Sequence, residues 1–309
     1  MAGAGQAYSL SAISPTIYEP AVNQPLRKML VALEVANVLP LPGGKDVKIR
    51  RFTGMTAAQY TPGTPVTAAA ATWTQDTITI TTYKHSTFYH DRIVSPLIDI
   101  NDVRELAFDT AYQLKNKIDT HVFANITGAD GFVNYQADAA LLGGTAHRPI
   151  SAGSANIINL FAKARELMRQ NNVEEMGDWC AVVTPKIAGF IEIKAASSGF
   201  QVADATLRNG YAGNFMGFEV YYSNNLPSGS CSTIAATISG SAVSATTCKS
   251  ILFGRKKMIH LYLQPPRLYV ANVDDKVGTN YITYATYGSG LPTNNRSRGL
   301  NVAVQSGYY

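Results

Sequence analysis

The five histidines are the residues whose chemistry could be catalytic or metal-binding, because imidazole carries protons near neutral pH and is a common metal ligand. His85 and His90 lie five positions apart on a predicted strand, so their side chains point to opposite faces and are badly placed to share a metal ion. His121, His147 and His260 stand alone. No GxSxG, HExxH or CxxC motif accompanies them. The sequence therefore predicts no catalytic residue, no metal site and no enzyme, with an unrecognised hydrolase as an alternative.

Motifs that bind phosphates or nucleotides are also missing. Residues 42–45 (Pro-Gly-Gly-Lys) lack the spacing of a phosphate-binding loop and predict a turn before a strand. Residues 210–213 (Gly-Tyr-Ala-Gly) follow no predicted strand, so a dinucleotide site is not expected. Asp274 and Asp275 fit a solvated turn better than a divalent-ion site, which needs more oxygen ligands. We expect no cofactor.

The three cysteines, Cys180, Cys231 and Cys248, form no CxxC pair, and their odd number argues against a disulfide framework. Cys231 and Cys248 lie where a hairpin would place them opposite each other. A bond between them stays open at this point, and a reducing compartment would disfavour it.

Charged residues make up only 15% of the chain, against a typical value near 25%. The net charge is +5, and its one tight basic cluster is residues 255–257. Such scattered charge is compatible with non-specific contact to phosphates but not with reading a nucleic-acid sequence. Tyr281, Tyr284 and Tyr287 could stack on bases, but alternating tyrosines on a strand are more typical of sheet packing. The N-terminus has no signal-peptide pattern and no stretch is long and apolar enough to span a membrane, so we expect a soluble protein made in the cytosol, with no membrane partner.

The element that would organise these residues is a long amphipathic helix predicted for residues 98–128. Its apolar stripe has i, i+3, i+4, i+7 spacing and includes Leu106, Leu114, Ile118 and Val122. Asp102 with Glu105 fits a capping box at its start. The side away from the stripe is polar and contains Arg104, Glu105, Asp109, Lys115, Asn116 and Asp119.

Two segments before this helix lack the means to bury themselves. Residues 1–22 have few large apolar side chains, which is typical of an arm that becomes ordered on a partner. A short helix should follow from Asn23 and end at Pro40. Strands are predicted for residues 45–52 and 74–92, with about 20 small and polar residues between them. Because a structureless loop of that length is uncommon in a compact domain, a two-stranded excursion that lies on a neighbour is the better explanation.

A compact α/β segment follows the long helix. A helical stripe runs over residues 157–168, and residues 179–183 read as a strand buried on both faces. Thr184 and Pro185 then start a second helix, and residues 215–222 form another strand. Residues 228–249 read as a hairpin or an ordered loop, and residues 250–264 as strand or helix. Strands over residues 267–273, 281–287 and 300–305 close the chain.

This order of parts resembles the major capsid protein of tailed bacteriophages, which has the Hong Kong 97-type α+β fold. Two phrases carry the resemblance: the buried strand leading into a Thr-Pro helix at residues 179–191, and MGFEVYYSNNLP at residues 216–227, which is similar to a G-F-x-V-x-x-S-N-x-L-P stretch of the family's axial domains. The resemblance implies an N-terminal arm and short helix (1–44), an extended loop (45–92), a spine helix with the first part of the peripheral domain (93–149), an axial domain (150–264) and return strands of the peripheral domain (265–309).

The same resemblance implies a structural virion protein that assembles into pentamers and hexamers of an icosahedral shell around double-stranded DNA, in the cytoplasm of a bacterial host. Scaffolding, portal and decoration proteins are further partners in that family. An encapsulin-like nanocompartment shell protein and a secreted or tail β-rich surface protein are the alternatives. Nothing in the residues specifies the triangulation number, the host or a cross-link.

Overall fold

The computed structural model describes residues 30–41, 44–52, 57, 59–65, 72–91, 100–127, 132–135, 156–173, 178–197, 213–230, 247–264, 266–272, 277–296 and 298–305. The predictions for the N-terminal arm, for most of the connection between the two strands of the excursion and for the loop after residue 197 lie outside these ranges.

The long helix is present as α2, Ile100–Thr127. Its second half buries a stripe at Leu114, Ile118, Val122 and Ile126, as the spacing predicts. Two details of the prediction are wrong. Asp102 is not the N-cap, because the helix already includes Ile100. Asp119 is not on the solvent side: it is only 2% exposed, because the chain around residues 31–32 and 225 also covers this half of the helix.

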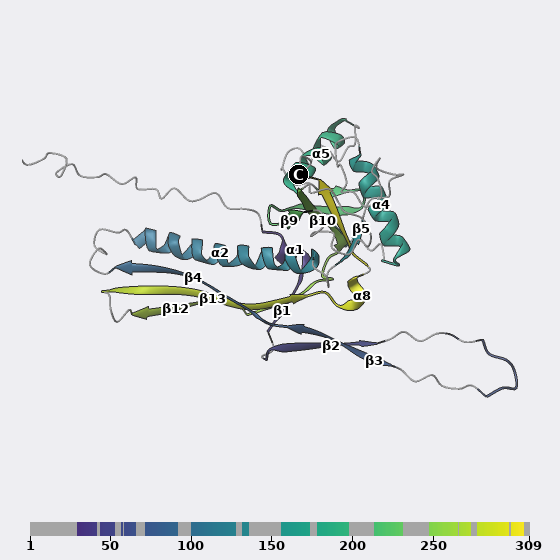
Figure 1. Cartoon of the computed structure of the whole chain (residues 1–309), viewed down its shortest axis with the longest axis horizontal. Helices are drawn as coiled ribbons and strands as arrows, with labels where there is room; N and C mark the ends of the chain where they lie inside the picture. Colours follow the sequence, from purple (N-terminus) through teal and green to yellow (C-terminus); the bar gives the residue numbers. More distant parts are fainter. Residues whose placement is uncertain are drawn as a thin grey trace, which may run out of the picture.

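A five-stranded sheet lies along α2 (Figure 1). Its centre is β13, Gly278–Gly290, which pairs on one edge with β4, Thr82–Asp91. The other edge of β13 pairs with β11, His260–Leu263, and β12, Arg267–Asn272. Outside β11 lies the parallel strand β1, Asn37–Pro40.

Two predicted elements have other bounds in the structure. The short helix is only α1, Ala32–Val35, within the described residues, and the chain then extends into β1 instead of remaining helical to Pro40. The single strand expected over residues 74–92 is two strands, β3 at Trp73–Thr79 and β4, which join different sheets. The buried pair Ile78 and Ile80 lies at the break, so alternation alone did not reveal it.

The predicted excursion exists as a hairpin of β2, Asp46–Phe52, and β3, paired antiparallel from Asp46↔Thr79 to Phe52↔Trp73. Within the residues that the structure describes, it shares no ladder with the other sheets, and it points away from the rest of the molecule (Figure 1). Its strands confirm the alternation read from residues 45–52.

The compact α/β segment forms a lobe at the other end of α2 from residue 100 (Figure 1). Its seven-stranded mixed sheet is flanked by α4, Ile157–Gln170, and α5, Pro185–Ser197. The strands, in spatial order, are β5 (Val133–Tyr135), β14 (Leu300–Gln305), β10 (Thr247–Arg255), β6 (Trp179–Val183), β8 (Phe218–Tyr222) and β7 (Asn214–Phe215), with β9 (Ser228–Ser230) also on β10.

The lobe includes segments from outside residues 150–264. β5 joins its sheet from before that range, and within the range β11 leaves the lobe for the sheet beside α2. Residues 250–264, left open between helix and strand, are thus strand in both β10 and β11. The last strand, β14, was expected among the return strands of the peripheral domain (265–309), but it pairs with β10 of the lobe. The reason is that Leu300, Val302 and Val304 alternate toward the apolar core of the lobe.

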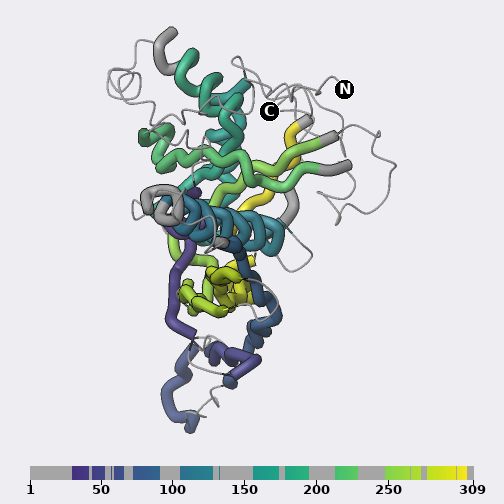
Figure 2. Tube along the Cα trace, turned by 90° about the vertical axis from the view of Figure 1, so that its left-hand side faces the viewer, coloured from purple at the N-terminus to yellow at the C-terminus, as the bar shows by residue number. Residues whose placement is uncertain are grey.

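Two large apolar clusters hold these layers together, and a third, small one of Ile78, Ile80 and Tyr262 packs the base of the hairpin against β11. The first lies between α4, α5 and one face of the lobe sheet. The second joins α1, the second half of α2, the opposite face of the lobe sheet and the end of β13. Figure 2, viewed along the helix, shows α2 between the lobe and the five-stranded sheet. The fold is thus a mixed α+β structure: a lobe, and an elongated region made of α2, the five-stranded sheet and the hairpin. Among the described residues, no helix is long and apolar enough to cross a membrane.

Candidate assembly surfaces

The structure does not gather the residues first considered for chemistry. His85 and His90 lie opposite Tyr284 and Thr279 in the β4–β13 ladder, His121 is on α2, and His260 begins β11. His147, Asp274 and Asp275 lie outside the described residues. In the part of the chain that the structure describes, no three His, Cys, Asp or Glu side chains come close enough to hold a metal ion.

The tyrosines of β13 are mostly packing residues. Tyr287 is fully buried and contacts the His121 ring edge-on at 5.1 Å, and Tyr281 stacks on Phe88 at 4.8 Å. Burial raises the pKa of Tyr287 to about 12 and lowers that of His121, with Lys84 adding to the decrease. The predicted sheet packing is confirmed for these two tyrosines.

The cysteines separate into two kinds. Cys180 is a buried free thiol whose pKa is raised to about 12 by burial, so it is unreactive at neutral pH. Cys248 is fully buried and disulfide-bonded. Cys231, the other cysteine of the predicted hairpin, lies outside the described residues.

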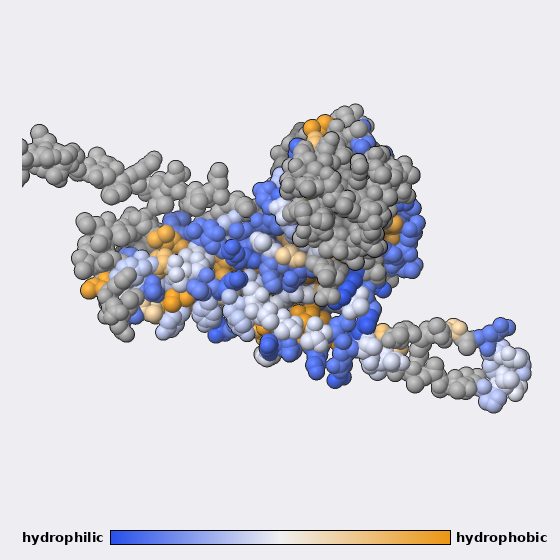
Figure 3. Space-filling model, in the orientation of Figure 1, coloured by the Kyte–Doolittle hydropathy of each residue, from blue (hydrophilic) through white to orange (hydrophobic). Residues whose placement is uncertain are grey.

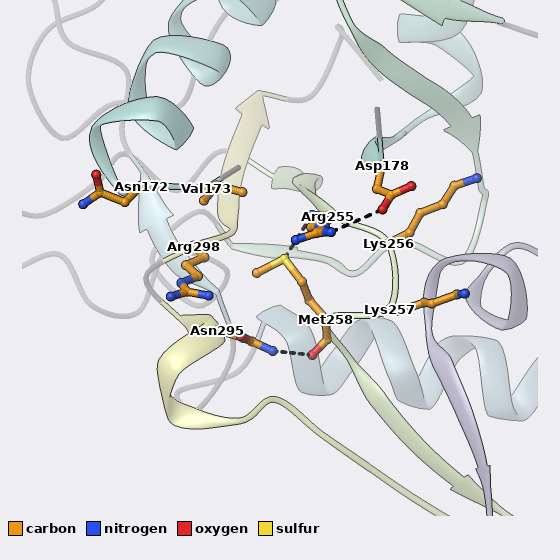
Figure 4. A pocket seen from close by; sticks show the side chains of 9 residues that line it. All are labelled: Asn172, Val173, Asp178, Arg255, Lys256, Lys257, Met258, Asn295 and Arg298. Carbon is orange, nitrogen blue, oxygen red and sulfur yellow. Dashed lines mark hydrogen bonds and ion pairs between the residues drawn. The ribbon is translucent and has the colours of Figure 1, made fainter. Parts of the chain in front are cut away.

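The basic cluster at residues 255–257 lines a hollow of about 380 Å³ together with Asp178, Asn295 and Arg298. Two of its cations are already paired: Arg255 with Asp178 at 3.4 Å, and Lys256 with Glu219. Figure 4 shows the Lys256 and Lys257 side chains pointing away from Arg298 instead of converging. The cations therefore do not form a ligand site.

The turn that carries this cluster is instead the junction of the two regions, since it leads from β10 to β11. Its backbone bonds reach both sides: the Lys256 N–H donates to the Asp178 carbonyl and the Lys257 N–H to the Val35 carbonyl, at 2.9 and 2.8 Å. The Lys256 ammonium also lies 5.2 Å from the centre of the Tyr221 ring. Tyr221 donates to Glu219 Oε1 at 2.6 Å, and burial together with this bond raises the pKa of Tyr221.

A second junction explains the SNNLP phrase of the sequence. The carboxylate of Asp119 accepts hydrogen bonds from the Val31 and Ala32 N–H groups through Oδ1, at 2.9 and 2.7 Å, and from Asn225 Nδ2 through Oδ2, at 2.8 Å. Ser223 Oγ accepts from the Asn225 N–H. One buried carboxylate on α2 thus holds the entry to α1 and the loop after β8. Sequence reasoning noted the phrase but missed its partner, which is 106 residues away.

The hairpin is fixed at its root by the short helix α8, Thr293–Arg296. Asp76 accepts from the Thr293 N–H at 3.1 Å and from the Thr293 hydroxyl at 2.7 Å, and Arg51 donates to Asn294 at 2.6 Å. Partial desolvation of Asp76 is outweighed by these bonds and by Arg51 and Arg296, so its pKa is lowered. These contacts orient the hairpin relative to the body.

At the far end of its paired strands the hairpin carries an exposed aromatic pair. Phe52 and Trp73 lie directly opposite each other with ring centres 5.3 Å apart, and they are 42% and 65% exposed. Large aromatic side chains in such positions are typical of residues buried by association.

Further apolar side chains are exposed at the end of the elongated region that lies away from the lobe (Figure 3). Leu106 on α2, Leu268 and Val270 on β12, and Val277 before β13 are each about half exposed, at 47%, 54%, 51% and 60%. Together with the Phe52–Trp73 pair, they leave the molecule with apolar surfaces that a monomeric soluble protein would rarely display.

Such surfaces are typical of a structural protein that associates with other subunits. The chain belongs to the phage capsid protein family: the family model described as "Phage capsid protein" matches residues 74–300.

Solved structures agree with this family. The chain is similar to a structure from Mycobacterium phage Che8, with a TM-score of 0.70 and 16% identity over 93% of this chain and 96% of that one. It is also similar to the capsid of the cyanophage P-SCSP1u, with a TM-score of 0.68 and 15% identity over 96% and 95% of the chains. For the capsid of a native GTA particle the TM-score is 0.63, with 14% identity over 96% and 99%. No curated protein sequence matches the chain.

The protein is therefore a major capsid protein, a structural component of the virion shell. This confirms the resemblance drawn from residues 179–191 and 216–227, and it does not favour the encapsulin alternative. The family indicates a non-enzymatic role.

Proposed function

We propose that the chain has the Hong Kong 97-type arrangement and forms pentamers and hexamers of an icosahedral shell around double-stranded DNA. In this assignment residues 1–44 are the N-terminal arm and short helix, 45–92 the extended loop, and 93–149 the spine helix with the first part of the peripheral domain. Residues 150–264 are the axial domain except for β11, which pairs with β13. Residues 265–309 return to the peripheral domain except for β14, which together with β5 completes the lobe sheet.

One observation carries the proposal: the hairpin projects from the body and presents the exposed Phe52–Trp73 pair, for which no described residue of the same chain provides a cover. A two-stranded hairpin is marginal in water by itself. A neighbouring subunit supplies the missing contact, so the hairpin lies across that neighbour, while the lobes meet at the five-fold and six-fold centres.

The energetic argument concerns how much surface such contacts bury. Obligate interfaces bury on the order of 2,000–5,000 Å². At about 25 cal/mol per Å² of apolar area, the gross stabilisation of one such contact exceeds the stability of a typical fold, before association and ordering costs reduce it. Shells therefore persist under conditions that unfold isolated subunits.

DNA is held without sequence readout, because the net charge of +5 is spread along the chain. Assembly takes place in the bacterial cytoplasm. Scaffolding, portal and decoration proteins are the expected further partners, although no described residue is assigned to them.

The test is negative-stain electron microscopy of the expressed chain, with nuclease-protected nucleic acid measured in purified particles. We expect closed shells, with protected double-stranded DNA when the chain is produced in an infected host. Deleting residues 54–73 should give soluble subunits without shells. Shells at wild-type yield from that deletion, or particles that contain a protein cargo and no DNA, would contradict the proposal.

Point variants make the same test without a deletion. Phe52→Ala with Trp73→Ala should lower shell yield at least about tenfold, the loss expected for interface anchors worth more than about 1.4 kcal/mol. Thr77→Ala is the matched control, because Thr77 is exposed on the same face of the hairpin but contributes little apolar area.

A further inference from the structure

The two long edges of the five-stranded sheet differ in how well their side chains prevent pairing with a further strand. Among the described strands, β4 and β12 each pair only with β13, so each has one open edge. Along its length β4 carries the charged Lys84 and the polar His85 and His90, and a lysine on an edge strand discourages pairing with another strand. In β12 the four central residues 268–271 (Leu-Tyr-Val-Ala) carry no charge, and Arg267 stands only at its start.

The side chains of β12 are exposed on both faces of the sheet. Leu268 and Val270 lie opposite Thr283 and Tyr281 on the face that α2 covers, since Thr110 of α2 contacts the Thr283 hydroxyl at 3.3 Å. Both are nevertheless about half exposed, because the helix packs over β13 and β4 and leaves β12 uncovered. Tyr269, on the other face, is 58% exposed.

Next to β12, the outer edge of the same sheet is already paired with another strand. β11 and β12 follow each other along one edge of β13, and β1 pairs with β11 from Asn37 to Pro40. No described strand continues this outer row beside β12. Among the described residues, the edge of β12 from Leu268 to Ala271 thus has no strand beside it, and its apolar side chains lie on both faces of the sheet.

We propose that β12 accepts an extended strand from a second copy of the chain when the shell assembles. The proposal rests on the proposed function, because a capsid shell brings many copies of this chain together. Main-chain hydrogen bonds to the open edge hold the added strand, and Leu268, Val270 and Tyr269 pack against its side chains. A charged edge such as β4 does not need a partner, whereas an apolar edge left open would promote uncontrolled aggregation.

Hydrogen exchange tests this directly. Shells assembled from the purified chain alone are compared with unassembled subunits, and exchange is followed in peptides that cover residues 266–272 and residues 82–90. We expect the β12 amides to exchange at least about tenfold more slowly in shells, with a smaller change along β4. Equal exchange of β12 in the two forms, or protection that requires another protein, overturns the proposal. Shells with an unprotected β12 would leave the proposed function intact, whereas failure to form shells would count against that function.

Matched variants provide the second measurement. Val270→Lys places a charge in the centre of the open edge and should lower shell yield at least about tenfold, and Thr87→Lys places the same charge on β4 and should leave it near wild type. Subunit unfolding midpoints of both variants establish that they fold. If Val270→Lys lowers the midpoint, Val270→Thr replaces it, since threonine keeps the strand preference and removes a methyl contact. Equal assembly of the β12 and β4 variants contradicts the proposal.

Discussion

The lobe and the elongated region bury their apolar residues in different ways. In the lobe, Phe161 is fully buried and its ring meets those of Phe215, Phe218 and Phe253 edge-on at 5.0–5.8 Å. All five residues of β6 are buried. In the elongated region, Thr110 is the only buried side chain among residues 105–113 of α2, and β12 has four exposed residues in a row.

This difference indicates which region stabilises the isolated subunit and which region becomes fully buried only on assembly. Edge-to-face aromatic packing and burial give the lobe a closed core of its own. The elongated region is closed where the second half of α2 meets α1 and the lobe, and in a small cluster of Ile78, Ile80 and Tyr262 at the base of the hairpin, but not at its two far ends. We therefore expect substitutions in the lobe to change subunit stability and substitutions at the far ends of the elongated region to change assembly.

The largest expected effect is that of Phe161→Ala. Removing this ring leaves a cavity at the meeting point of four aromatic side chains and should lower the free energy of unfolding by about 3–5 kcal/mol. Urea unfolding of unassembled subunits, followed by the fluorescence of the buried Trp179, measures it.

Trp73→Ala is the opposite case, since this side chain is 65% exposed. It should change the unfolding free energy by less than about 0.5 kcal/mol while lowering shell yield. A loss of stability comparable to that of Phe161→Ala would mean that the hairpin is part of the core of the subunit, and the comparison between the regions would fail.

The next effect concerns the connection between the regions. Asp119→Ala leaves the buried N–H groups of Val31 and Ala32 without their acceptor. It also removes one of the two acceptors of Asn225 Nδ2, the other being Asn116 Oδ1. We expect a loss of about 3 kcal/mol, because each unsatisfied buried donor costs on the order of 1–3 kcal/mol and the site partly rearranges. Asp119→Asn should cost less, since one oxygen remains as an acceptor.

A double-mutant cycle sharpens this prediction. Asn225→Ala combined with Asp119→Ala should cost at least about 0.5 kcal/mol less than the sum of the two single substitutions, because the residues share one hydrogen bond. Additive effects would show that the carboxylate holds only the entry to α1, and that the loop after β8 is held by other contacts.

The sequence predicted local elements well and distant partners poorly. The long helix, the Thr184–Pro185 helix start and strand β6 follow from periodicity within a few residues, which local sequence carries. Asp119 was placed on the solvent side because a helical pattern does not reveal a second covering element. Its partners at residues 31–32 and 225 are about 90 and 106 positions away.

The same limit explains the errors in strand assignment. β14 and β4 have ordinary alternating patterns, and only the tertiary pairing decides which sheet each of them joins. For the assembly surfaces, the excursion was predictable from its composition. The open edge of β12 was not, because an edge is defined by strands that are missing beside it.

A smaller effect should appear as a pH dependence of the elongated region. Burial lowers the pKa of His260, and burial with Lys84 lowers that of His121. The two imidazole rings therefore bind a proton more readily in the unfolded chain than in the folded one. The stability that the neutral rings contribute is complete above pH 6.5, the ordinary pKa of histidine. It is lost as the pH falls from 6.5 through the lowered folded values. Unfolding midpoints measured from pH 7.5 to 5 should therefore decrease.

Substituting both histidines by glutamine should flatten that decrease. Over the same pH range the loss of stability in the lobe should be smaller than in the elongated region, since none of the lobe's described residues is histidine. An unchanged pH slope in the double variant would assign the pH dependence to other groups.

The smallest expected effect lies at the root of the hairpin. Thr293→Ala removes one of two hydrogen bonds to Asp76 and should loosen β3 by about 0.5–1 kcal/mol, because the contact is exposed to solvent. Hydrogen exchange of the β3 amides in unassembled subunits should then accelerate up to about fivefold. Thr293→Ser, which keeps the hydroxyl, is the matched control. Since the pKa of Asp76 is lowered, its contribution is complete above about pH 3.8 and is lost as the pH falls through the folded value. If Thr293→Ala leaves β3 unchanged, Arg51 and Asn294 hold the hairpin without Asp76, and its direction is fixed from β2 alone.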